Sequence, residues 1–348
     1  MKVKERDVRV DILRFIAIVG IILAHSEPFG ALFQLRNFDV VLMVLLLGTS
    51  FYLSNHNKKA VQFGDYLVKR FNRLVVPTWQ FLFMFFVLFW LISLINGDSY
   101  YFKIWNIVDS FALMNDDGSS SIGYVWIMKV FFVIAVISPF LLKLSQVIKN
   151  NFVYLLLLSA VYAIYAGLVY INDFIFNGLV HNMIENFLIY GIGYGLIAAF
   201  GIRLKLFSKK EIKVLTAIFF VLFVTLYFVH NHAPTQQFKY PPMLYYMAYG
   251  LLVSLLLYQI LQVKWIYRIL NNKFVLFVSK TSLWLYFWHI IPIYFVKLFG
   301  NLIPIIDMNF ITRFTFYFVA ALLLTYIQEL VNNKRMAIRK NKNLLKVG

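Results

Sequence analysis

The chain has 348 residues, of which 61% are hydrophobic, 19% aromatic and 14% charged, and its mean hydropathy is +0.76. Soluble domains carry about 25% charged residues, so this composition excludes a soluble protein and predicts an all-α integral membrane protein. The sequence lacks cysteine, which excludes disulfides, thiolate metal sites and a thiol nucleophile.

Apolar runs of about 17 to 25 residues mark membrane-spanning helices, and we predict ten of them. The first run contains Arg14 and lacks a small-residue cleavage site, so we expect it to stay as a span and not to be a signal peptide. We treat 1–348 as a single transmembrane domain with no soluble domain. The predicted spans are 12–29, 38–53, 75–95, 124–142, 152–171, 184–202, 214–230, 243–261, 274–299 and 310–331.

The net charge of +18 follows this topology. With the N-terminus in the cytoplasm, the outer loops hold only Arg36, Lys103 and Lys239 of the 33 basic residues, and four more lie within spans. The positive-inside rule therefore predicts that both termini are cytoplasmic, and it removes nucleic acid as a partner. The longest outer loop, 96–123, has a polar tip at 115–121 and an aromatic segment, 100–114, expected to form an interfacial helix.

The first span carries charged and titratable residues near both ends. Eleven residues separate Arg14 from His25, which is three helical turns plus about 20°, so both lie on one face roughly 16 Å apart. Asp11 precedes Arg14 by three residues and can pair with it. Because ionisable groups are costly in lipid, this stripe is expected to line a cavity.

His25 is the sharpest catalytic candidate. A histidine at the outer end of a span can act as a general base, and a nearby carboxylate can orient it. Glu27 precedes Pro28, which disfavours helical geometry, so Glu27 can turn back toward His25. The alternative is a histidine that only faces interfacial water.

Three arginines near the cytoplasmic side are functional candidates. Arg70 and Arg73 lie one helical turn apart just before the third span, whose early Pro77 suits a helix start. Two guanidinium groups on one face form a good phosphate site. The alternatives are contact with lipid headgroups for this pair and a snorkelling anchor for Arg14.

Other polar residues lie within later spans. His289 needs a polar partner at its depth, and Tyr286, one turn earlier, can supply it, so both packing and catalytic roles stay open. Lys129, Lys297 and Arg313 can neutralise an acidic residue or contact an anionic acceptor. The acidic residues considered are Glu27, Asp116, Asp117 and Asp307. His230 and His232 are expected to be solvated, and no metal site is expected.

Several motifs in their order resemble the acyltransferase 3 family, the bacterial membrane O-acyltransferases of surface polysaccharides. They are D-I-L-R-F-I-A-I with His25 downstream, R-F-N-R before L-V-V-P, V-W-I-M around Trp126 before Pro139, and L-Y-F-W-H ending at His289. One motif departs from the family: the second span reads L-L-L-G-T-S-F-Y-L-S where the family has a phenylalanine-rich Ser-Gly-Phe sequence. Gly48 keeps a small residue for close packing there.

The resemblance implies transfer of an acyl group, usually acetyl, from cytoplasmic acyl-CoA to a sugar hydroxyl on the far side of a bacterial cytoplasmic membrane. The family's essential arginine and histidine correspond to Arg14 and His25, and its coenzyme-associated arginines correspond to Arg70 and Arg73. Glu27 would support the His25 imidazolium, and direct transfer is expected because no activated serine is evident.

Two other functions stay open at this point. A transporter or flippase of lipid-linked sugar would line a path with the intramembrane cations, but it would usually show internal symmetry, which the sequence lacks. A non-catalytic component of a glycan assembly complex would tolerate loss of His25. The acyl group, the glycan acceptor, glycan-assembly partners and any homo-oligomer are not fixed by the sequence.

Overall fold

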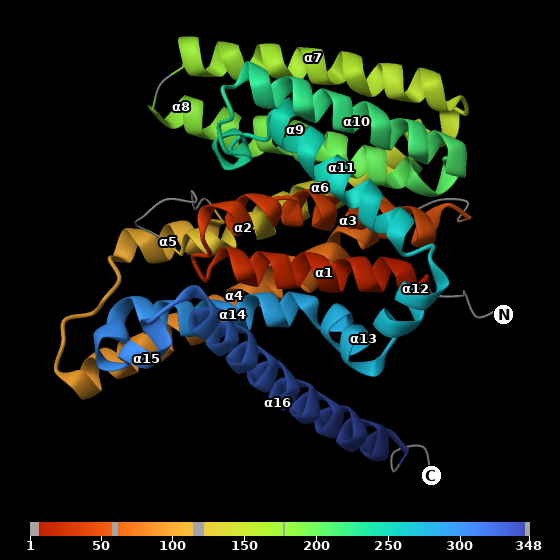
Figure 1. Ribbon diagram of the computed structural model, residues 1–348. Helices are drawn as coiled ribbons and strands as arrows, with labels where there is room; N and C mark the ends of the chain where they lie inside the picture. Colours follow the sequence, from red (N-terminus) through yellow and green to blue (C-terminus); the bar gives the residue numbers. More distant parts are fainter. Residues whose placement is uncertain (1–6, 58–61, 114–121, 177, 345–348) are drawn as a thin grey trace. The chain divides into compact units, whose positions relative to one another are not determined.

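The computed structural model describes residues 7–57, 62–113, 122–176 and 178–344, and all regular secondary structure in these ranges is helical (Figure 1). This confirms the predicted all-α class. The chain divides into two compact units. Unit 1 comprises Met1–Arg36 and Arg268–Gly348, and unit 2 comprises Asn37–Tyr267. The boundary near Tyr267 falls within the short helix α12 (Lys264–Leu270).

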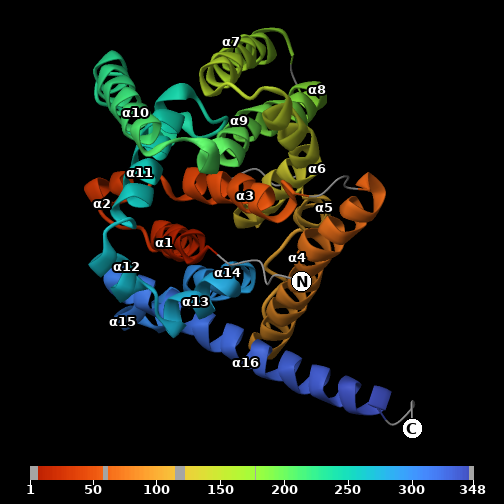
Figure 2. The same ribbon diagram turned by 90° about the vertical axis from the view of Figure 1, so that its right-hand side faces the viewer.

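Unit 1 is built from both ends of the sequence. Helix α1 contacts α13, α14 and α16, and Figures 1 and 2 both show it beside α13 and α14. Asp7 caps α1 by accepting a hydrogen bond from the backbone N–H of Arg9 at 3.1 Å. The helices of unit 1 are α1 (Val8–Ala24), α2 (Gly30–Leu35), α13 (Lys273–Lys280), α14 (Ser282–Phe299), α15 (Pro304–Asp307) and α16 (Phe310–Leu344).

Unit 2 contains the middle of the chain. Its helices are α3 (Asp39–Asn55), α4 (Phe63–Asn96), α5 (Ile104–Ala112), α6 (Trp126–Val147), α7 (Asn151–Ile175), α8 (Gly178–Met183), a π-helical turn (Ile184–Ile189), α9 (Tyr190–Arg203), α10 (Lys209–Val229) and α11 (Leu244–Ile260). Helix α5 lies within the segment expected to form an interfacial helix. The polar tip at 115–121 lies outside the described residues.

Helices α3 and α9 pack closely against each other within unit 2. A Cβ atom at Gly48 would overlap the backbone carbonyl of Ala198, and one at Gly201 would overlap that of Leu45. Thr49 lies at the same crossing and donates a hydrogen bond to the carbonyl of Gly201 at 2.9 Å. Small residues therefore bring the two backbones together, as expected for Gly48 and as is common between membrane helices.

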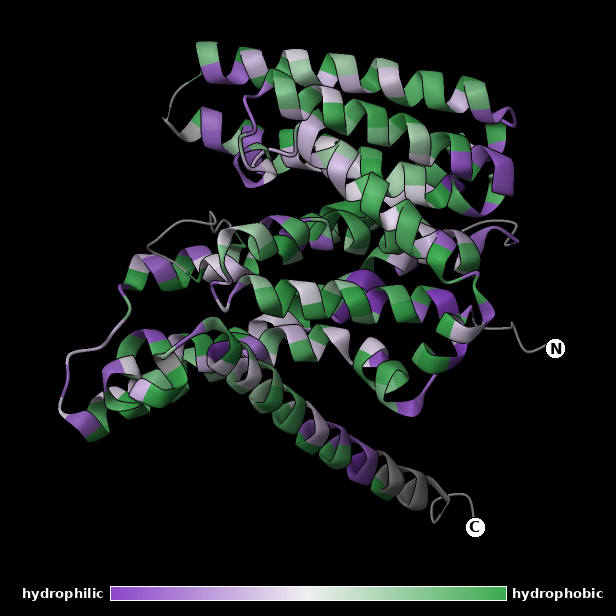
Figure 3. Cartoon of the chain, viewed as in Figure 1, coloured by the Kyte–Doolittle hydropathy of each residue, from purple (hydrophilic) through white to green (hydrophobic). Residues whose placement is uncertain are grey.

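The ten predicted spans all overlap helices. Helix α11 qualifies as a span when joined to α12 across a 98° bend, and α1, with 17 residues, is shorter than each of the eight segments that can span on their own. Figure 3 shows apolar residues along most of α7 and α10. Eight segments of the described chain are long and apolar enough to span on their own: Gly30–Asn55, Phe63–Asn96, Gly123–Val147, Asn151–Ile175, Val180–Arg203, Lys209–Val229, Ser282–Leu302 and Phe310–Arg335.

Three expectations about helix limits differ from the helices of the structure. The first span ends at Ala24 and not at residue 29. The ninth is divided at Thr281, which lies between α13 and α14 with φ −100° and ψ 12°. Helix α4 begins at Phe63, so Pro77 lies in its interior and not near its start.

An apolar pocket of about 260 Å³ lies between α4, α5 and the segment that joins them. Burial raises the pKa of Tyr100 to about 12, so its hydroxyl stays protonated at neutral pH and donates to the carbonyl of Phe86 at 2.9 Å. The lining consists of Phe83, Phe86, Val87, Trp90, Tyr100, Ile107 and Phe111. Because none of these side chains is charged, the pocket does not suit a phosphate group.

Candidate functional site

His25 lies directly after the last residue of α1 and is half-buried. The helix stops here for local reasons. The hydroxyl of Ser26 donates to the carbonyl of Leu23 at 2.8 Å, and Glu27 has φ +54°, in the left-handed region that most residues avoid. The expected departure of Glu27 from helical geometry is therefore confirmed, and the imidazole of His25 is placed at a helix end.

His289 from α14 lies beside His25. The two imidazole rings have centroids 5.4 Å apart and planes tilted by 31°. Nothing in the sequence spacing predicts this proximity, because 264 positions separate the two residues. The structure thus brings together two titratable rings that the sequence presented as separate candidates.

His289 is fully buried, with 0% of its surface exposed. Its Nδ1 hydrogen bonds with the backbone carbonyl of Tyr286, and the Tyr286 ring centroid lies 5.0 Å from the imidazole centroid. Tyr286 is therefore a partner of His289, as considered from the sequence, through its backbone oxygen and its ring. The Nε2 atom of His289 has no hydrogen-bond partner among the described residues.

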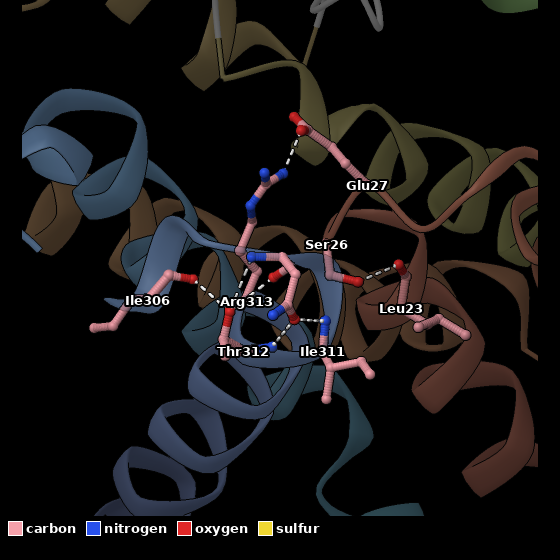
Figure 4. A network of polar contacts seen from close by, with 8 residues as sticks. Leu23, Ser26, Glu27, Ile306, Ile311, Thr312 and Arg313 are labelled. Atoms are coloured by element: carbon pink, nitrogen blue, oxygen red, sulfur yellow. Dashed lines mark hydrogen bonds and ion pairs between the residues drawn. The ribbon is translucent and has the colours of Figure 1, made fainter. Parts of the chain in front are cut away.

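Glu27 forms an ion pair with Arg313 at the start of α16, as Figure 4 shows. This pair is one of the alternatives that the sequence left open for Arg313. The carboxylate of Glu27 is 74% exposed. The expected support of His25 by Glu27 stays a prediction, because the ion pair that the structure describes for this carboxylate is with Arg313.

The start of α16 is held by hydrogen bonds around Thr312. The side-chain oxygen of Asn309 accepts from the backbone N–H groups of Ile311 at 2.9 Å and of Thr312 at 3.1 Å, which caps the helix. The hydroxyl of Thr312 donates to the carbonyl of Ile306 at 2.9 Å (Figure 4). These contacts fix the position of Arg313 on the first turn of α16.

At the other end of α1, Arg14 and Asp11 form the expected ion pair. The Nη1 atom of Arg14 lies 3.0 Å from Asp11 Oδ1 and 3.4 Å from the hydroxyl of Ser279. Ser279 also donates to Asp11 Oδ1 at 3.3 Å. The sequence analysis missed Ser279, because no periodicity within one segment reveals that α13 packs against α1.

Arg14 and His25 retain the spacing expected from the sequence. Helix α1 is unbroken from Val8 to Ala24, so three helical turns separate the guanidinium-bearing residue from the imidazole-bearing one. Arg14 is 24% exposed, and its Asp11 partner is buried. One helix therefore presents an anchored cation near one end and a general base candidate at the other.

Arg70 and Arg73 lie in unit 2, within the first three turns of α4. Arg73 is exposed, and the guanidinium of half-buried Arg70 lies 5.1 Å from the ring centroid of Tyr66. Helix α4 has 34 residues and is about 51 Å long, which exceeds a hydrocarbon core of about 30 Å. The two arginines therefore lie on a helical extension that precedes the apolar part of α4.

Trp126 and Lys129 also lie in unit 2, at the start of α6, among aromatic side chains. Lys129 is buried, hydrogen bonds with the side-chain oxygen of Asn186, and lies with its Nζ 5.4 Å from the ring centroid of Tyr190. Trp126 packs edge-on against Tyr240 with ring centroids 4.9 Å apart. Asn186 was not among the partners considered for Lys129.

The remaining sequence candidates have simpler surroundings. Lys297 lies with its Nζ 5.4 Å from the Tyr294 ring centroid. His232 is exposed, as expected, whereas His230 is half-buried, with its ring centroid 4.3 Å from that of Phe238. Asp116, Asp117 and the side chain of Asp307 lie outside the described residues, so their expected pairing stays a prediction.

The arrangement in unit 1 suits proton transfer. An imidazole can accept a proton from a hydroxyl group and later return it, and a second buried imidazole lies within ring contact. The anchored Arg14 can donate hydrogen bonds to an anionic group. Within the described residues, no cluster of three or more His, Asp or Glu side chains could hold a metal ion.

Comparison with known proteins gives one finding. The family model of the acyltransferase 3 family, described as an acyltransferase domain, matches residues 7–328. This match runs from the start of α1 into α16 and includes all the site residues described above. No curated protein and no solved structure matches the chain.

Proposed function

Because the chain belongs to the acyltransferase 3 family and is a membrane acyltransferase, we propose that it O-acylates a glycan across a bacterial cytoplasmic membrane. The donor is cytoplasmic acyl-CoA, with acetyl as the transferred group. The acceptor is a hydroxyl of an extracytoplasmic surface polysaccharide or lipid-linked glycan. One observation carries the proposal. In this family member, α1 holds both Arg14, which is anchored by Asp11, and His25, which lies at the end of the helix.

In this proposal the donor binds through its phosphate groups. Arg14, Arg70 and Arg73 supply guanidinium groups that can form bidentate hydrogen bonds with phosphate oxygens. The partial exposure of Arg14 and Arg70 and the exposure of Arg73 leave donor groups accessible to a ligand. The pantetheine arm of the donor then carries the thioester toward His25.

His25 acts as the general base. It accepts the proton of the acceptor hydroxyl as the oxygen attacks the thioester carbonyl, and the new carbon–oxygen bond replaces the carbon–sulfur bond. The proton passes from the imidazolium to the leaving thiolate, so the products are the ester and free coenzyme A. Glu27, two residues away, stabilises the imidazolium in this scheme.

The aromatic and cationic cluster around Trp126 and Lys129 is proposed to face the acceptor. Aromatic rings stack on sugar faces, and a buried ammonium group can bind an anionic substituent. Helices α6 and α9 together carry the cluster. The family match favours this enzyme over the transporter and over a non-catalytic component, because neither of those requires an acyltransferase domain.

The test is the ester content of the host's surface glycan in a deletion strain. Complementation with wild type is expected to restore the ester, whereas His25→Ala and His25→Gln are expected to reduce the transfer rate by about 10²- to 10⁴-fold through loss of the base. Arg70→Ala is expected to weaken donor binding. His232→Asn is the matched control, because this histidine is exposed and asparagine tolerates its positive φ of 64°.

Two outcomes would contradict the proposal. If glycan export failed in the deletion strain while any exported glycan kept its normal ester content, the transporter interpretation would replace the enzyme. If both His25 variants restored the ester as well as wild type did, His25 would not be the base.

A further inference from the structure

His289 has no role in the proposed chemistry, yet it lies against the proposed base. Its ring centroid is 5.4 Å from that of His25, and none of its surface is exposed. A buried polar atom is normally hydrogen-bonded, so an unpartnered buried nitrogen beside a proposed base calls for a specific explanation.

The hydrogen bond at Nδ1 fixes the tautomer of His289. A backbone carbonyl only accepts, so Nδ1 must carry the hydrogen that is shared with the carbonyl of Tyr286. In a neutral imidazole the other nitrogen then holds a lone pair. Nε2 of His289 is therefore a hydrogen-bond acceptor, and it has no donor among the described residues.

A single hydroxyl cannot serve both rings. It has one proton, and if that proton is donated to His289 it is not available to His25. Two hydroxyls on neighbouring carbons solve this problem, because each can donate to a different ring. The ring centroids of His25 and His289 are 5.4 Å apart. With hydrogen bonds of about 2.7–3.2 Å, two neighbouring hydroxyls can therefore reach one ring each.

We propose that the acceptor presents a vicinal diol, in which one hydroxyl donates to Nε2 of His289 while its neighbour loses its proton to His25. This inference rests on the proposed function, since it assumes that His25 is the base. The hydroxyl held by His289 keeps its proton throughout, and only the neighbouring oxygen forms the ester. His289 is thus a specificity-determining residue that selects the hydroxyl to be acylated.

The first test uses the purified full-length protein, acetyl-CoA, and two probe alcohols, cyclohexane-1,2-diol and cyclohexanol. Wild type is expected to prefer the diol by about tenfold or more in kcat/KM, the size of effect that one additional hydrogen bond gives. The number of hydroxyls alone accounts for a factor of about two. If His289 had a purely structural role, substituting it would not change the ratio of the two kcat/KM values.

Two substitutions separate the hydrogen bond from packing. His289→Phe keeps an aromatic ring but has no acceptor, and it is expected to lower the diol preference to about twofold. His289→Gln keeps an amide oxygen that can accept, and it is expected to retain part of the preference. His25→Gln is expected to reduce transfer to both alcohols by about 10²- to 10⁴-fold, so a failure of the proposed function is distinguished from a failure of this inference.

A second measurement does not depend on acceptance of small alcohols. The full-length protein is labelled with ¹⁵N-histidine, and the NMR signal of His289 is identified as the one that is missing from the spectrum of His289→Phe. In wild type this signal is expected to show a protonated Nδ1 and an unprotonated Nε2. A protonated Nε2 would overturn the proposal, as would a diol preference in wild type of only about twofold. An ester mapped on the host glycan to a hydroxyl with no free neighbour would overturn it as well.

Discussion

The guanidinium of Arg14 is anchored before any ligand arrives. Asp11 holds it from one turn earlier in α1, and Ser279 holds it from α13. A cation fixed by two partners loses little freedom when it binds an anion, so such anchoring improves affinity. The role proposed for Arg14 in donor binding therefore depends also on Asp11 and Ser279.

Asp11→Asn is expected to raise the KM for acetyl-CoA by about tenfold, equivalent to about 1.4 kcal/mol. The substitution keeps the shape of the side chain but removes the charge that orients Arg14. Ser279→Ala is the matched control and is expected to change KM by less than about threefold, because its contacts of 3.3 and 3.4 Å are long. Steady-state kinetics with varied acetyl-CoA would measure both, and an unchanged KM in Asp11→Asn would contradict the anchoring role.

At the scale of single residues, the sequence predicts contacts between residues that are close in the chain and misses contacts between residues that are far apart in it. The pairing of Asp11 with Arg14 follows from helical periodicity, because residues three apart share a face. The contacts of Arg14 with Ser279 and of His25 with His289 depend on how helices pack, which no single segment encodes. Arg313 was recognised as a candidate, but its choice of Glu27 among four acidic residues came from the structure.

Among the elements, α3 and α9 approach each other closely at two glycines. The crossing places Gly48 against Ala198 and Gly201 against Leu45, with backbone carbonyls where side chains would otherwise lie. Backbone atoms cannot move aside as a flexible side chain can. Any larger residue at these positions must therefore separate the two helices.

Gly48→Ala and Gly201→Ala are each expected to destabilise the protein by about 1–3 kcal/mol or more through overpacking, although alanine favours helices by about 1 kcal/mol over glycine. Gly167→Ala is the matched control. A Cβ there meets nothing within 4 Å, so this variant is expected to be as stable as wild type or slightly more stable. Thermal unfolding in detergent would measure the three variants, and stability equal to wild type in Gly48→Ala would contradict the close contact.

Helix existence was predictable, whereas several helix ends were not. Hydrophobic length identifies a span because the bilayer requires about 20 apolar residues. The ends depend on individual hydrogen bonds, such as the one from Ser26 to Leu23 that closes α1. Pro77 misled the prediction for α4, because proline is compatible with a helix interior where other groups compensate, as in membrane helices.

On the scale of the whole molecule, the distribution of basic residues predicts how the protein is oriented in the membrane. Outer loops were predicted to carry three of the 33 basic residues and spans four more, which favours a cytoplasmic location for the other 26. The family match supports a membrane acyltransferase but leaves this orientation untested. The absence of cysteine allows a direct test, because any introduced thiol is unique in the chain.

Lys69→Cys and Lys103→Cys are expected to react from opposite sides of the membrane. Both positions are exposed, and the predicted topology places Lys69 inside and Lys103 outside. A membrane-impermeant maleimide is expected to label Lys103→Cys in intact spheroplasts and to label Lys69→Cys only after permeabilisation. The reverse pattern would contradict the proposed orientation and the cytoplasmic location of Arg70 and Arg73.

Unit 1 is completed by residues that lie at the two ends of the chain, and this has a consequence for biosynthesis. A ribosome adds about 5–20 residues per second, so residues 37–267 take roughly 10 to 50 s to synthesise after α1 has emerged. During this interval Asp11 is available to neutralise Arg14, whereas Ser279, His289 and Arg313 have not yet been made. An unfinished chain therefore cannot form all three contacts, of Arg14 with Ser279, of His25 with His289 and of Glu27 with Arg313, until α16 has begun to be synthesised.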